Sequence, residues 1–166
     1  IVEQGKLAWD TTLADVFPEH AQHMTPSFVG VTVRQLLSHR AGLPGNLDWR
    51  ALDRTGTVPE QRLRVLRLAT AEEPAFAIGD KSHYSNLGYV MVGAVMERVT
   101  GRSWEETLRE QLFAPLKMAS AGFGGTGTRG LVNQPWPHTA GGKPTADNGP
   151  EVDNPAIIGP GGRVHC

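Results

Sequence analysis

The feature that most constrains this chain is a helix-start signature that occurs three times. A hydroxyl side chain stands three positions before Glu or Gln and directly precedes an apolar run, as Thr32 does with Gln35, Thr57 with Glu60 and Ser103 with Glu106. In such a capping box the hydroxyl accepts the backbone N–H of the third residue, whose side chain reaches back to the cap. The sequence therefore predicts three separate helices. The first should stop near Gly42, where glycine tolerates a left-handed cap, and the last should close at Pro115.

A fourth helix follows Asn86 and shows the clearest periodicity. Its apolar positions recur at helical spacing, at Leu87, Val90, Met91, Ala94 and Val95. Gly101 is expected to end it in the left-handed conformation. This pattern predicts one helix with a broad buried stripe.

The helix that begins after Thr57 carries apolar and basic side chains in close succession. The apolar ones fall on roughly one face and are Leu63, Leu66 and Ala69. We therefore expect the basic ones, Arg62, Arg64 and Arg67, to form a solvated face rather than a phosphate site.

The character of the chain changes near residue 120. Residues 120–166 hold eleven of the twenty glycines and six of the twelve prolines, with little periodic pattern. No convincing set of alternating strands occurs anywhere in the sequence. Because so long a structureless stretch is unusual inside a compact domain, it is either a linker or a segment that lies over a surface this chain does not supply. Such a tail next to helices without a sheet indicates a domain cut from something larger. The fold class predicted for this chain is mainly α with long irregular loops.

Composition and charge exclude several classes of protein. Sixteen basic residues against seventeen acidic ones give a formal net charge of -1, without the basic stripe typical of nucleic-acid binding. No apolar run is long enough to span a bilayer. Among the histidines only His20 and His23 are close in sequence, and they lack a third ligand, so we expect surface histidines and neither a metal nor a cofactor. The single cysteine, Cys166, excludes an internal disulfide and is expected to be a small buried side chain.

Four segments, in order, carry a pattern that covers nearly the whole chain. Residues 3–10 read EQGKLAWD, and residues 33–44 read VRQLLSHRAGLP. Residues 84–89 read YSNLGY and continue to VTGRS at 99–103, and residues 154–166 begin with NPA and end with GGRVHC. Together these segments resemble the class C β-lactamase-like family of serine hydrolases, which includes D-alanyl-D-alanine peptidases and esterases. The second segment is similar to the LLSHTSGLP stretch of that family.

The resemblance implies an α/β fold in which a helical cluster lies beside an antiparallel sheet, with the active site at their junction. Residues 1–166 are then a single partial domain. Residues 1–119 would supply the helical subdomain, and residues 120–166 would be the Gly/Pro-rich loop region that leads back to the sheet. The remaining parts of the parent protein are expected to pack on this chain.

Two of the three motifs that identify this family are missing here. The family is recognised by Ser-x-x-Lys, then Tyr-x-Asn, then a Lys/His-Thr/Ser-Gly strand, and only Tyr84-Ser85-Asn86 matches. By resemblance the first motif should precede residue 1 and the third should follow residue 166. Residues 138–141 read HTAG and are superficially similar to the third motif. We interpret them as a false match, because they precede the segment that should come before the true motif.

The resemblance implies roles for two residues. Tyr84 resembles the tyrosine that moves the proton when a serine attacks a carbonyl, since a serine needs a nearby base to become a nucleophile. Asn86 resembles the residue that hydrogen-bonds substrate and holds the lysine side chain. The alternative for Tyr84 is a packed ring with a hydrogen-bonded hydroxyl, and for Asn86 a helix N-cap. For Ser85, capping or surface exposure is expected rather than nucleophilic attack.

These observations predict part of a β-lactamase-like serine hydrolase that acts through a serine acyl-enzyme on amide, lactam or ester bonds. The expected partners are a small-molecule or peptide substrate, such as a β-lactam, a D-alanyl peptide or an ester, and no nucleic acid. The chain alone is expected to be inactive, because it contains no Ser-x-x-Lys. The alternative is a catalytically silent homologue that binds peptides or partners through the same cleft. A periplasmic or secreted location follows from the resemblance alone.

Overall fold

The computed structural model describes residues 1–49, 51–126, 131, 134–135, 138, 141–143 and 154–166. The α-helices are α1 (Leu13–Val16), α2 (Pro26–Val29), α3 (Val33–Leu37), α4 (Val58–Thr70), α5 (Asn86–Thr100), α6 (Trp104–Leu108) and α7 (Gly159–Gly162). Shorter turns are η1 (Ala21–His23), the π-helical η2 (Arg109–Phe113) and η3 (Ala156–Ile158). The two strands are β1 (Gly122–Phe123) and β2 (Val164–His165).

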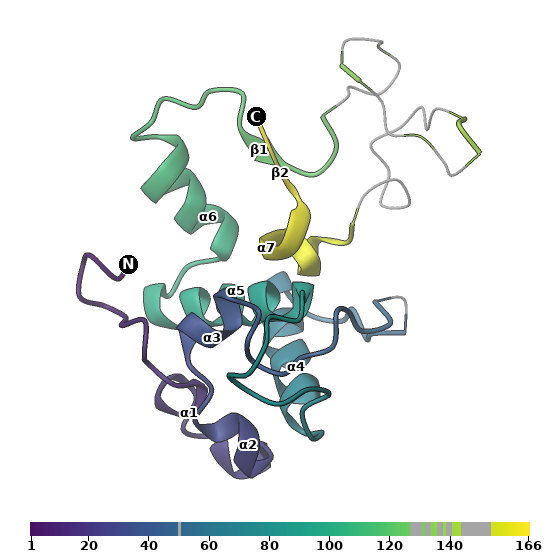
Figure 1. The fold of residues 1–166 in the computed structure, drawn as a ribbon. Coiled ribbons are helices and arrows are strands. Elements are labelled where there is room, and N and C mark those ends of the chain that lie inside the picture. The colour runs from purple at the N-terminus through teal and green to yellow at the C-terminus, as the bar shows by residue number, and fades with distance from the viewer. Residues whose placement is uncertain (50, 127–130, 132–133, 136–137, 139–140, 144–153) are drawn as a thin grey trace.

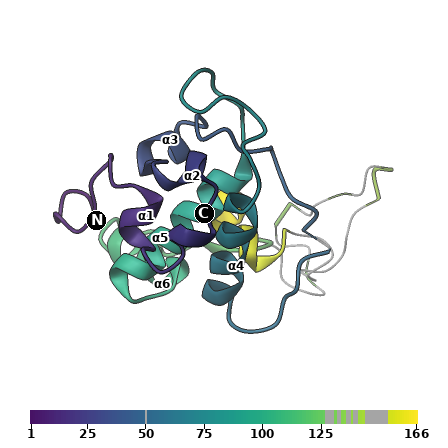
Figure 2. The ribbon, with the colours of Figure 1, turned by 90° about the horizontal axis from the view of Figure 1, so that it is seen from below.

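Helix α5 is the centre of this arrangement. It crosses the middle of the molecule, with α1 to α4 on one side and α6 and α7 on the other (Figure 1). Seen from below, α1, α3, α4 and α6 surround it (Figure 2). The predicted stripe is confirmed, because the side chains of Leu87, Val90, Met91, Ala94 and Val95 are all buried. Burial of this stripe against Leu36 of α3 and Leu66 of α4 forms the hydrophobic core.

The three predicted capping boxes are all formed, at Thr32, Thr57 and Ser103, and α1 begins with a fourth at Thr12. Helix α5 ends as predicted at Gly101, which has φ 68°. The predicted end of the first helix near Gly42 is wrong, since α3 ends at Leu37. Gly42, at φ 71°, serves a close approach instead, because a Cβ there would lie 2.4 Å from the carbonyl oxygen of Phe76.

Two short strands join the last described segment back to the helices. Strands β1 and β2 pair antiparallel, with Gly122 opposite His165 and Phe123 opposite Val164. The ring of Phe123 in β1 contacts the rings of Trp104 and Phe113. Strand β1 therefore links the strand that follows α7 to α6 and η2. Cys166, beyond the second strand, is exposed, so the expectation that it is buried is wrong.

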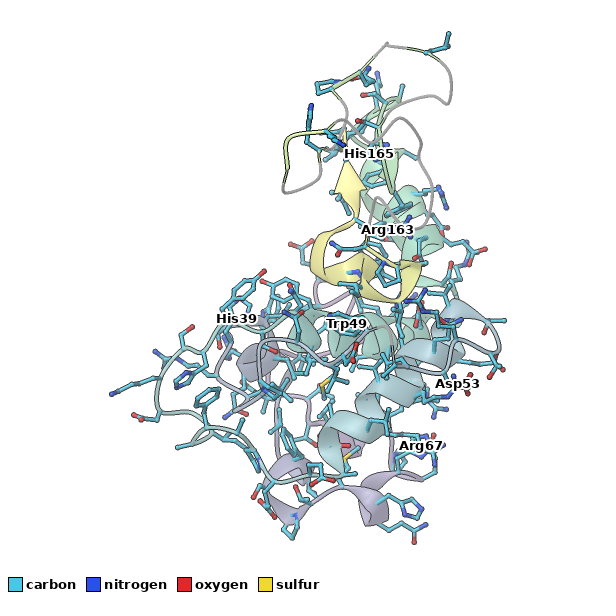
Figure 3. All side chains as sticks on the ribbon, turned by 90° about the vertical axis from the view of Figure 1, so that its right-hand side faces the viewer. His39, Trp49, Asp53, Arg67, Arg163 and His165 are labelled. Atoms are coloured by element: carbon cyan, nitrogen blue, oxygen red, sulfur yellow. The ribbon has the colours of Figure 1, made fainter. Side chains whose placement is uncertain are left out.

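The predicted solvated face of α4 is wrong at one position. Arg67 is exposed and points away from α4 (Figure 3), but Arg62 is 0% exposed. The Arg62 guanidinium pairs with Glu97 of α5 and Glu105 of α6, at 2.5 Å in each case. Burial raises the pKa of the Glu97 carboxyl, while the charge of Arg62 acts in the opposite direction. A buried cluster of Arg62, Glu97 and Glu105 therefore joins α4, α5 and α6. The periodicity had predicted a solvent-exposed surface at Arg62.

Candidate active site

Tyr84 and Asn86 lie where an extended segment enters α5. Ser85 is the N-cap residue, with φ -147° and ψ 120°, and Asn86 is the first residue of the helix. The backbone N–H of Asn86 donates to the carbonyl of Gly45 at 2.9 Å, which ties the helix start to the loop after α3. The Tyr84 residue is 67% exposed, so its ring faces open space. Both residues proposed from the motif thus occupy one corner of the molecule.

The amide of Asn86 is held in one orientation by a chain of hydrogen bonds. The Trp49 indole Nε1–H, which can only donate, donates to Oδ1 of Asn46 at 3.1 Å. That same oxygen accepts from Nδ2 of Asn86 at 2.9 Å. Oδ1 of Asn86 therefore faces the Tyr84 hydroxyl, which donates to it at 3.0 Å. The Trp49 N–H can only donate, so the Asn46 atom that it meets must be the oxygen. That oxygen in turn needs the nitrogen of the Asn86 amide, which leaves the Asn86 oxygen facing Tyr84.

Contacts of Ser85 and His39 fix the segment that carries Tyr84 and Asn86. The Ser85 hydroxyl donates to the carbonyl of Pro44 at 2.6 Å, and its backbone N–H donates to Nδ1 of His39 at 3.2 Å. The His39 ring contacts the ring of Tyr84, with centroids 4.8 Å apart. Ser85 occupies the N-cap position, but its hydroxyl makes no cap hydrogen bond, and at 2% exposure the expected surface location is wrong. The alternative N-cap role of Asn86 is also wrong, because Ser85 occupies that position.

A cleft separates the residues around Tyr84 from the glycine-rich turn formed by α7 and the residues after it. His39, Tyr84, Asn86 and Tyr89 face residues 159–164 across a cavity of about 340 Å³. A Cβ at Gly161 would lie 3.3 Å from Oδ1 of Asn86, so the backbone of the turn approaches the amide closely. Only a residue without a side chain allows this approach without a shift. The sequence segment 154–166 and the Tyr-Ser-Asn motif therefore form one site.

Two of the lining residues can carry positive charge. Arg163 lines the cleft from the turn that follows α7 (Figure 3), and His39 lines it from the end of α3. Because Nδ1 of His39 accepts from Ser85, the proton of the neutral ring lies on Nε2. Within the described ranges, no three His, Cys, Asp or Glu side chains are grouped closely enough to hold a metal ion. The groups that can act chemically here are a phenol, a carboxamide, an imidazole and a guanidinium.

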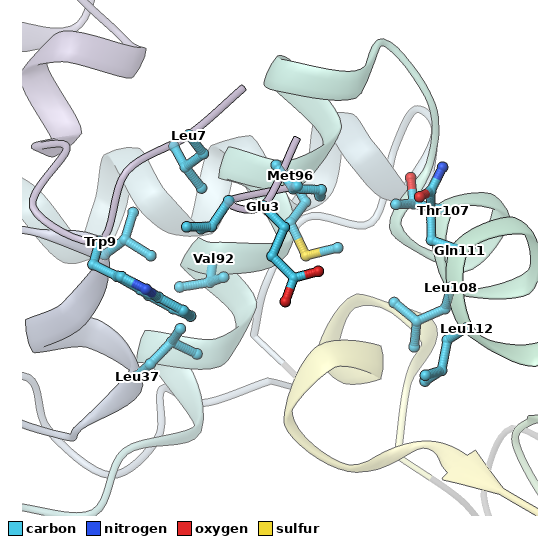
Figure 4. Close-up of a pocket in the computed structure, with 13 residues that line it drawn as sticks. Glu3, Leu7, Trp9, Leu37, Val92, Met96, Thr107, Leu108, Gln111 and Leu112 are labelled. Atoms are coloured by element: carbon cyan, nitrogen blue, oxygen red, sulfur yellow. The ribbon is translucent and has the colours of Figure 1, made fainter. Parts of the chain in front are cut away.

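A second cleft lies on the other side of α5, between the N-terminal segment and α6 (Figure 4). It has a volume of about 380 Å³ and is mostly apolar, lined by Leu7, Trp9, Val92, Met96 and Leu112 among others. Glu3 is the one residue with a titratable side chain that lines it. The cleft therefore offers mainly apolar contacts, with no second titratable side chain beside Glu3 among the described residues that line it. The cleft at Tyr84, where several polar and charged side chains meet, is the candidate for catalysis.

Comparison with known proteins identifies the family of this chain. The family model described as Beta-lactamase matches residues 1–165. This chain belongs to the β-lactamase family. "Penicillin-binding protein 4" of Amycolatopsis lactamdurans is 33% identical over 116 residues, which are 70% of this chain and 29% of that protein.

Solved structures of this β-lactamase family have the same fold. A penicillin-binding protein homologue from Caulobacter crescentus matches with a TM-score of 0.56 and 34% identity over 74% of this chain and 31% of that one. A class C β-lactamase in complex with cefoxitin matches with a TM-score of 0.74 and 21% identity, over 98% of this chain and 41% of that one. The predicted fold class is confirmed: a mainly helical part of the β-lactamase fold. The chain spans less than half the length of these relatives.

Sequence reasoning missed three residues of this β-lactamase-family site. Asn46 and Trp49 follow the 33–44 segment directly, but nothing in their local pattern indicates a contact with Asn86. His39 lies inside that segment, two residues after the end of α3, and nothing in the segment indicates its contacts with Tyr84 and Ser85. Of the HTAG stretch at 138–141, residues 139 and 140 lie outside the described residues. The assignment of the remaining motif residues to catalysis stays a prediction.

Proposed function

We propose that this chain forms the tyrosine-bearing wall of the active site of a serine hydrolase that acts on amide, lactam or ester bonds. The observation that supports it is the hydrogen-bonded array of Tyr84, Asn86 and Asn46 beneath the glycine-rich turn. The Ser-x-x-Lys and the Lys/His-Thr/Ser-Gly strand would be supplied by segments outside these 166 residues. The division into a helical part, residues 1–119, and a loop region, residues 120–166, belongs to the same proposal.

In the proposed reaction the serine oxygen bonds to the substrate carbonyl carbon and the serine proton passes to Tyr84. The carbon–nitrogen or carbon–oxygen bond then breaks, and the leaving group takes that proton. Water later attacks the acyl-enzyme and restores the serine. The phenol must lose its own proton to act as base, which nearby cations favour. The lysine of the Ser-x-x-Lys motif would supply such a cation.

Asn86 is proposed to bind the substrate. One hydrogen of its Nδ2 goes to Asn46, and the second can donate to a substrate carbonyl. The bond from Trp49 to Asn46 keeps that nitrogen directed the same way in the free protein. A donor oriented in advance does not have to be ordered when substrate binds.

The test is covalent labelling of the protein expressed from its complete reading frame. We expect a labelled penicillin to attach at one equivalent, and Tyr84→Phe to slow acylation by about 10²-fold or more. Tyr89→Phe removes the other phenol hydroxyl, which bonds the Leu37 carbonyl, and should change the rate little. Equal rates for Tyr84→Phe and the unsubstituted protein would exclude the proposed role of Tyr84.

The 166-residue chain by itself is expected to hydrolyse neither β-lactams nor aryl esters. It contains no Ser-x-x-Lys, and no adjacent base pattern supports Ser85 as a nucleophile. The measurement is product release after mixing with a chromogenic substrate. A burst of one equivalent per chain would contradict this expectation.

A catalytically silent homologue is the second candidate, and it would lack Ser-x-x-Lys throughout its complete reading frame. Such a protein would bind a peptide or another partner in the cleft reversibly. Labelled penicillin that dissociates on denaturation, with binding weakened by Asn86→Ala, would support this function over hydrolysis.

Export to the periplasm or cell exterior is a further part of the proposal, tested by fractionation of cells that express the complete reading frame. In the part of the chain that the structure describes, no helix is both long and apolar enough to cross a bilayer.

A further inference from the structure

Arg62 is the most buried charged group in the described part of the chain, and its hydrogen bonds reach beyond the two carboxylates. Nη2 donates to the carbonyl of Ala156 at 2.8 Å, and Nε donates to the carbonyl of Ile157 at 3.2 Å. Both carbonyls belong to η3, the turn that leads directly into α7. One guanidinium therefore joins α4, α5 and α6 to the segment that forms the cleft wall.

The glycines of this segment fit closely around the same cluster. A Cβ at Gly159 would lie 2.8 Å from Nη2 of Arg62, and one at Gly93 of α5 would lie 2.5 Å from Cγ of Pro160. Gly161, two residues further on, approaches Oδ1 of Asn86. The position of the turn is thus set by contacts with Arg62 on one side and with α5 on the other. A shift of the turn at Ala156 would move the wall that faces Asn86.

We propose that Arg62 is a positioning residue for the active-site cleft. Its planar guanidinium holds the carbonyls of Ala156 and Ile157, and so keeps the glycine-rich turn at the distance from Asn86 that substrate binding requires. The effect on substrate binding rests on the function proposed above, whereas the positioning of the turn by Arg62 does not depend on that function. Arg62 touches no reacting atom, because it is fully buried beneath the turn.

Lysine in place of Arg62 separates positioning from charge. Lysine keeps the positive charge, but its ammonium cannot reproduce the fixed, planar donors that bond two carboxylates and two carbonyls at once. The matched control is Arg67→Lys, the same substitution at an exposed position of the same helix. Glu105→Gln is a milder second variant. It weakens the paired bonds from Nη1 and Nη2, at 3.0 and 2.5 Å, without leaving a buried carboxylate unpaired.

Two measurements are made on the protein from the complete reading frame. The first is amide hydrogen exchange of the segment 156–163. The second is KM and kcat with a chromogenic β-lactam, because a fold that is merely less stable lowers apparent kcat through the folded fraction and leaves KM unchanged. For Arg62→Lys we expect faster exchange in that segment and a KM raised about fivefold, with kcat per folded site within about twofold. Glu105→Gln should change KM in the same direction by less, and Arg67→Lys should change neither measurement.

Unchanged KM in both Arg62→Lys and Glu105→Gln would overturn the inference and leave Arg62 a residue of fold stability alone. If Arg62→Lys does not fold, Glu105→Gln decides by the same criteria. If the unsubstituted protein is neither acylated by the β-lactam nor turns it over, the proposed function fails for lactams, and the exchange measurement still decides. Faster amide exchange at 156–163 in Arg62→Lys then supports the proposal that Arg62 keeps the turn in place, and unchanged exchange overturns it.

Discussion

Glu97 shows at the scale of one residue how burial and charge compete. Its carboxyl receives the short bond from Arg62 and the backbone N–H of Trp104, both at Oε1. Oε2 is buried without a hydrogen-bond partner among the described residues. Because Glu105 shares the same guanidinium, Arg62 does not fully offset the cost of burying the Glu97 charge. The pKa of Glu97 is therefore raised above its ordinary value of 4.5.

A raised pKa in the folded state gives a definite pH dependence. The contribution of Glu97 to stability is complete below its unfolded pKa of about 4.5 and is lost as pH rises through the higher folded pKa. Glutamine has nearly the same shape and cannot ionise. Denaturant unfolding between pH 4 and pH 7 should therefore show Glu97→Gln gaining stability relative to the unsubstituted protein as pH rises. The opposite trend would mean that attraction to Arg62 outweighs burial.

Gly88 is the residue where α5 and α3 come closest. A Cβ there would lie 2.7 Å from the carbonyl oxygen of Leu36, a backbone atom that cannot turn aside. We expect Gly88→Ala to lower the free energy of unfolding by about 1–3 kcal/mol through overpacking. Gly30→Ala is the control, since nothing lies within 4 Å of that Cβ. Urea denaturation should place Gly30→Ala at or above the stability of the unsubstituted protein, and equal losses for the two variants would contradict the packing argument.

At the scale of elements, the helix starts are local structures that sequence alone could predict. The Ser103 hydroxyl accepts the N–H of Glu106 at 3.2 Å, and the Glu106 carboxylate accepts the backbone N–H of Ser103 at 2.9 Å, so both halves of the box form within four residues. The same is true at Thr32 and Thr57. Such contacts need no distant partner, and the predictions for them are confirmed. The predicted end of α3 near Gly42 failed, because the helix already ends at Leu37, before Ser38 and His39, whose φ is 59°, whereas Gly42 serves the close approach to Phe76.

Removal of one N-cap hydroxyl measures how much such a local contact stabilises the protein. Ser103→Ala should destabilise the protein by about 1 kcal/mol, because the N–H groups at the start of α6 lose an acceptor. Ser120→Ala, at an exposed turn, should change stability by less than about 0.5 kcal/mol. Hydrogen bonds from Ser103 hold the pKa of the Glu106 carboxyl below its usual range, a contribution that is lost as pH falls through that lowered pKa. Thermal unfolding should therefore show a smaller penalty for Ser103→Ala at pH 3 than at pH 7.

At the scale of the whole molecule, the apolar cleft at the N-terminal segment stands out. Trp9 is 46% exposed and Leu112 is 43% exposed, and both line it. Apolar surface of this kind favours association or cover by another segment. The chain is therefore expected to be soluble only with this face covered.

We predict that the 166-residue chain self-associates and binds an apolar dye. Leu112→Glu places a charge in the cleft and should reduce both effects, whereas Leu68→Glu, at a residue 49% exposed on α4 and outside the cleft, should not. Sedimentation and dye fluorescence measure the two effects. A monodisperse monomer with a cooperative thermal transition and no dye binding would contradict the prediction.

The sequence by itself determined the helix starts, the buried stripe of α5 and the family resemblance, and it pointed to Tyr84 and Asn86, whose role in catalysis stays a prediction. All of these are encoded in short runs, where partners are three or four positions apart or adjacent in a motif. Tertiary structure alone decided that Arg62 is buried, since its partners Glu97, Glu105 and Ile157 lie 35, 43 and 95 positions away. It also brought Asn46, 40 positions from Asn86, into the site. Periodicity reports which face of a helix is apolar, but a paired charge is buried only where distant segments supply its partners.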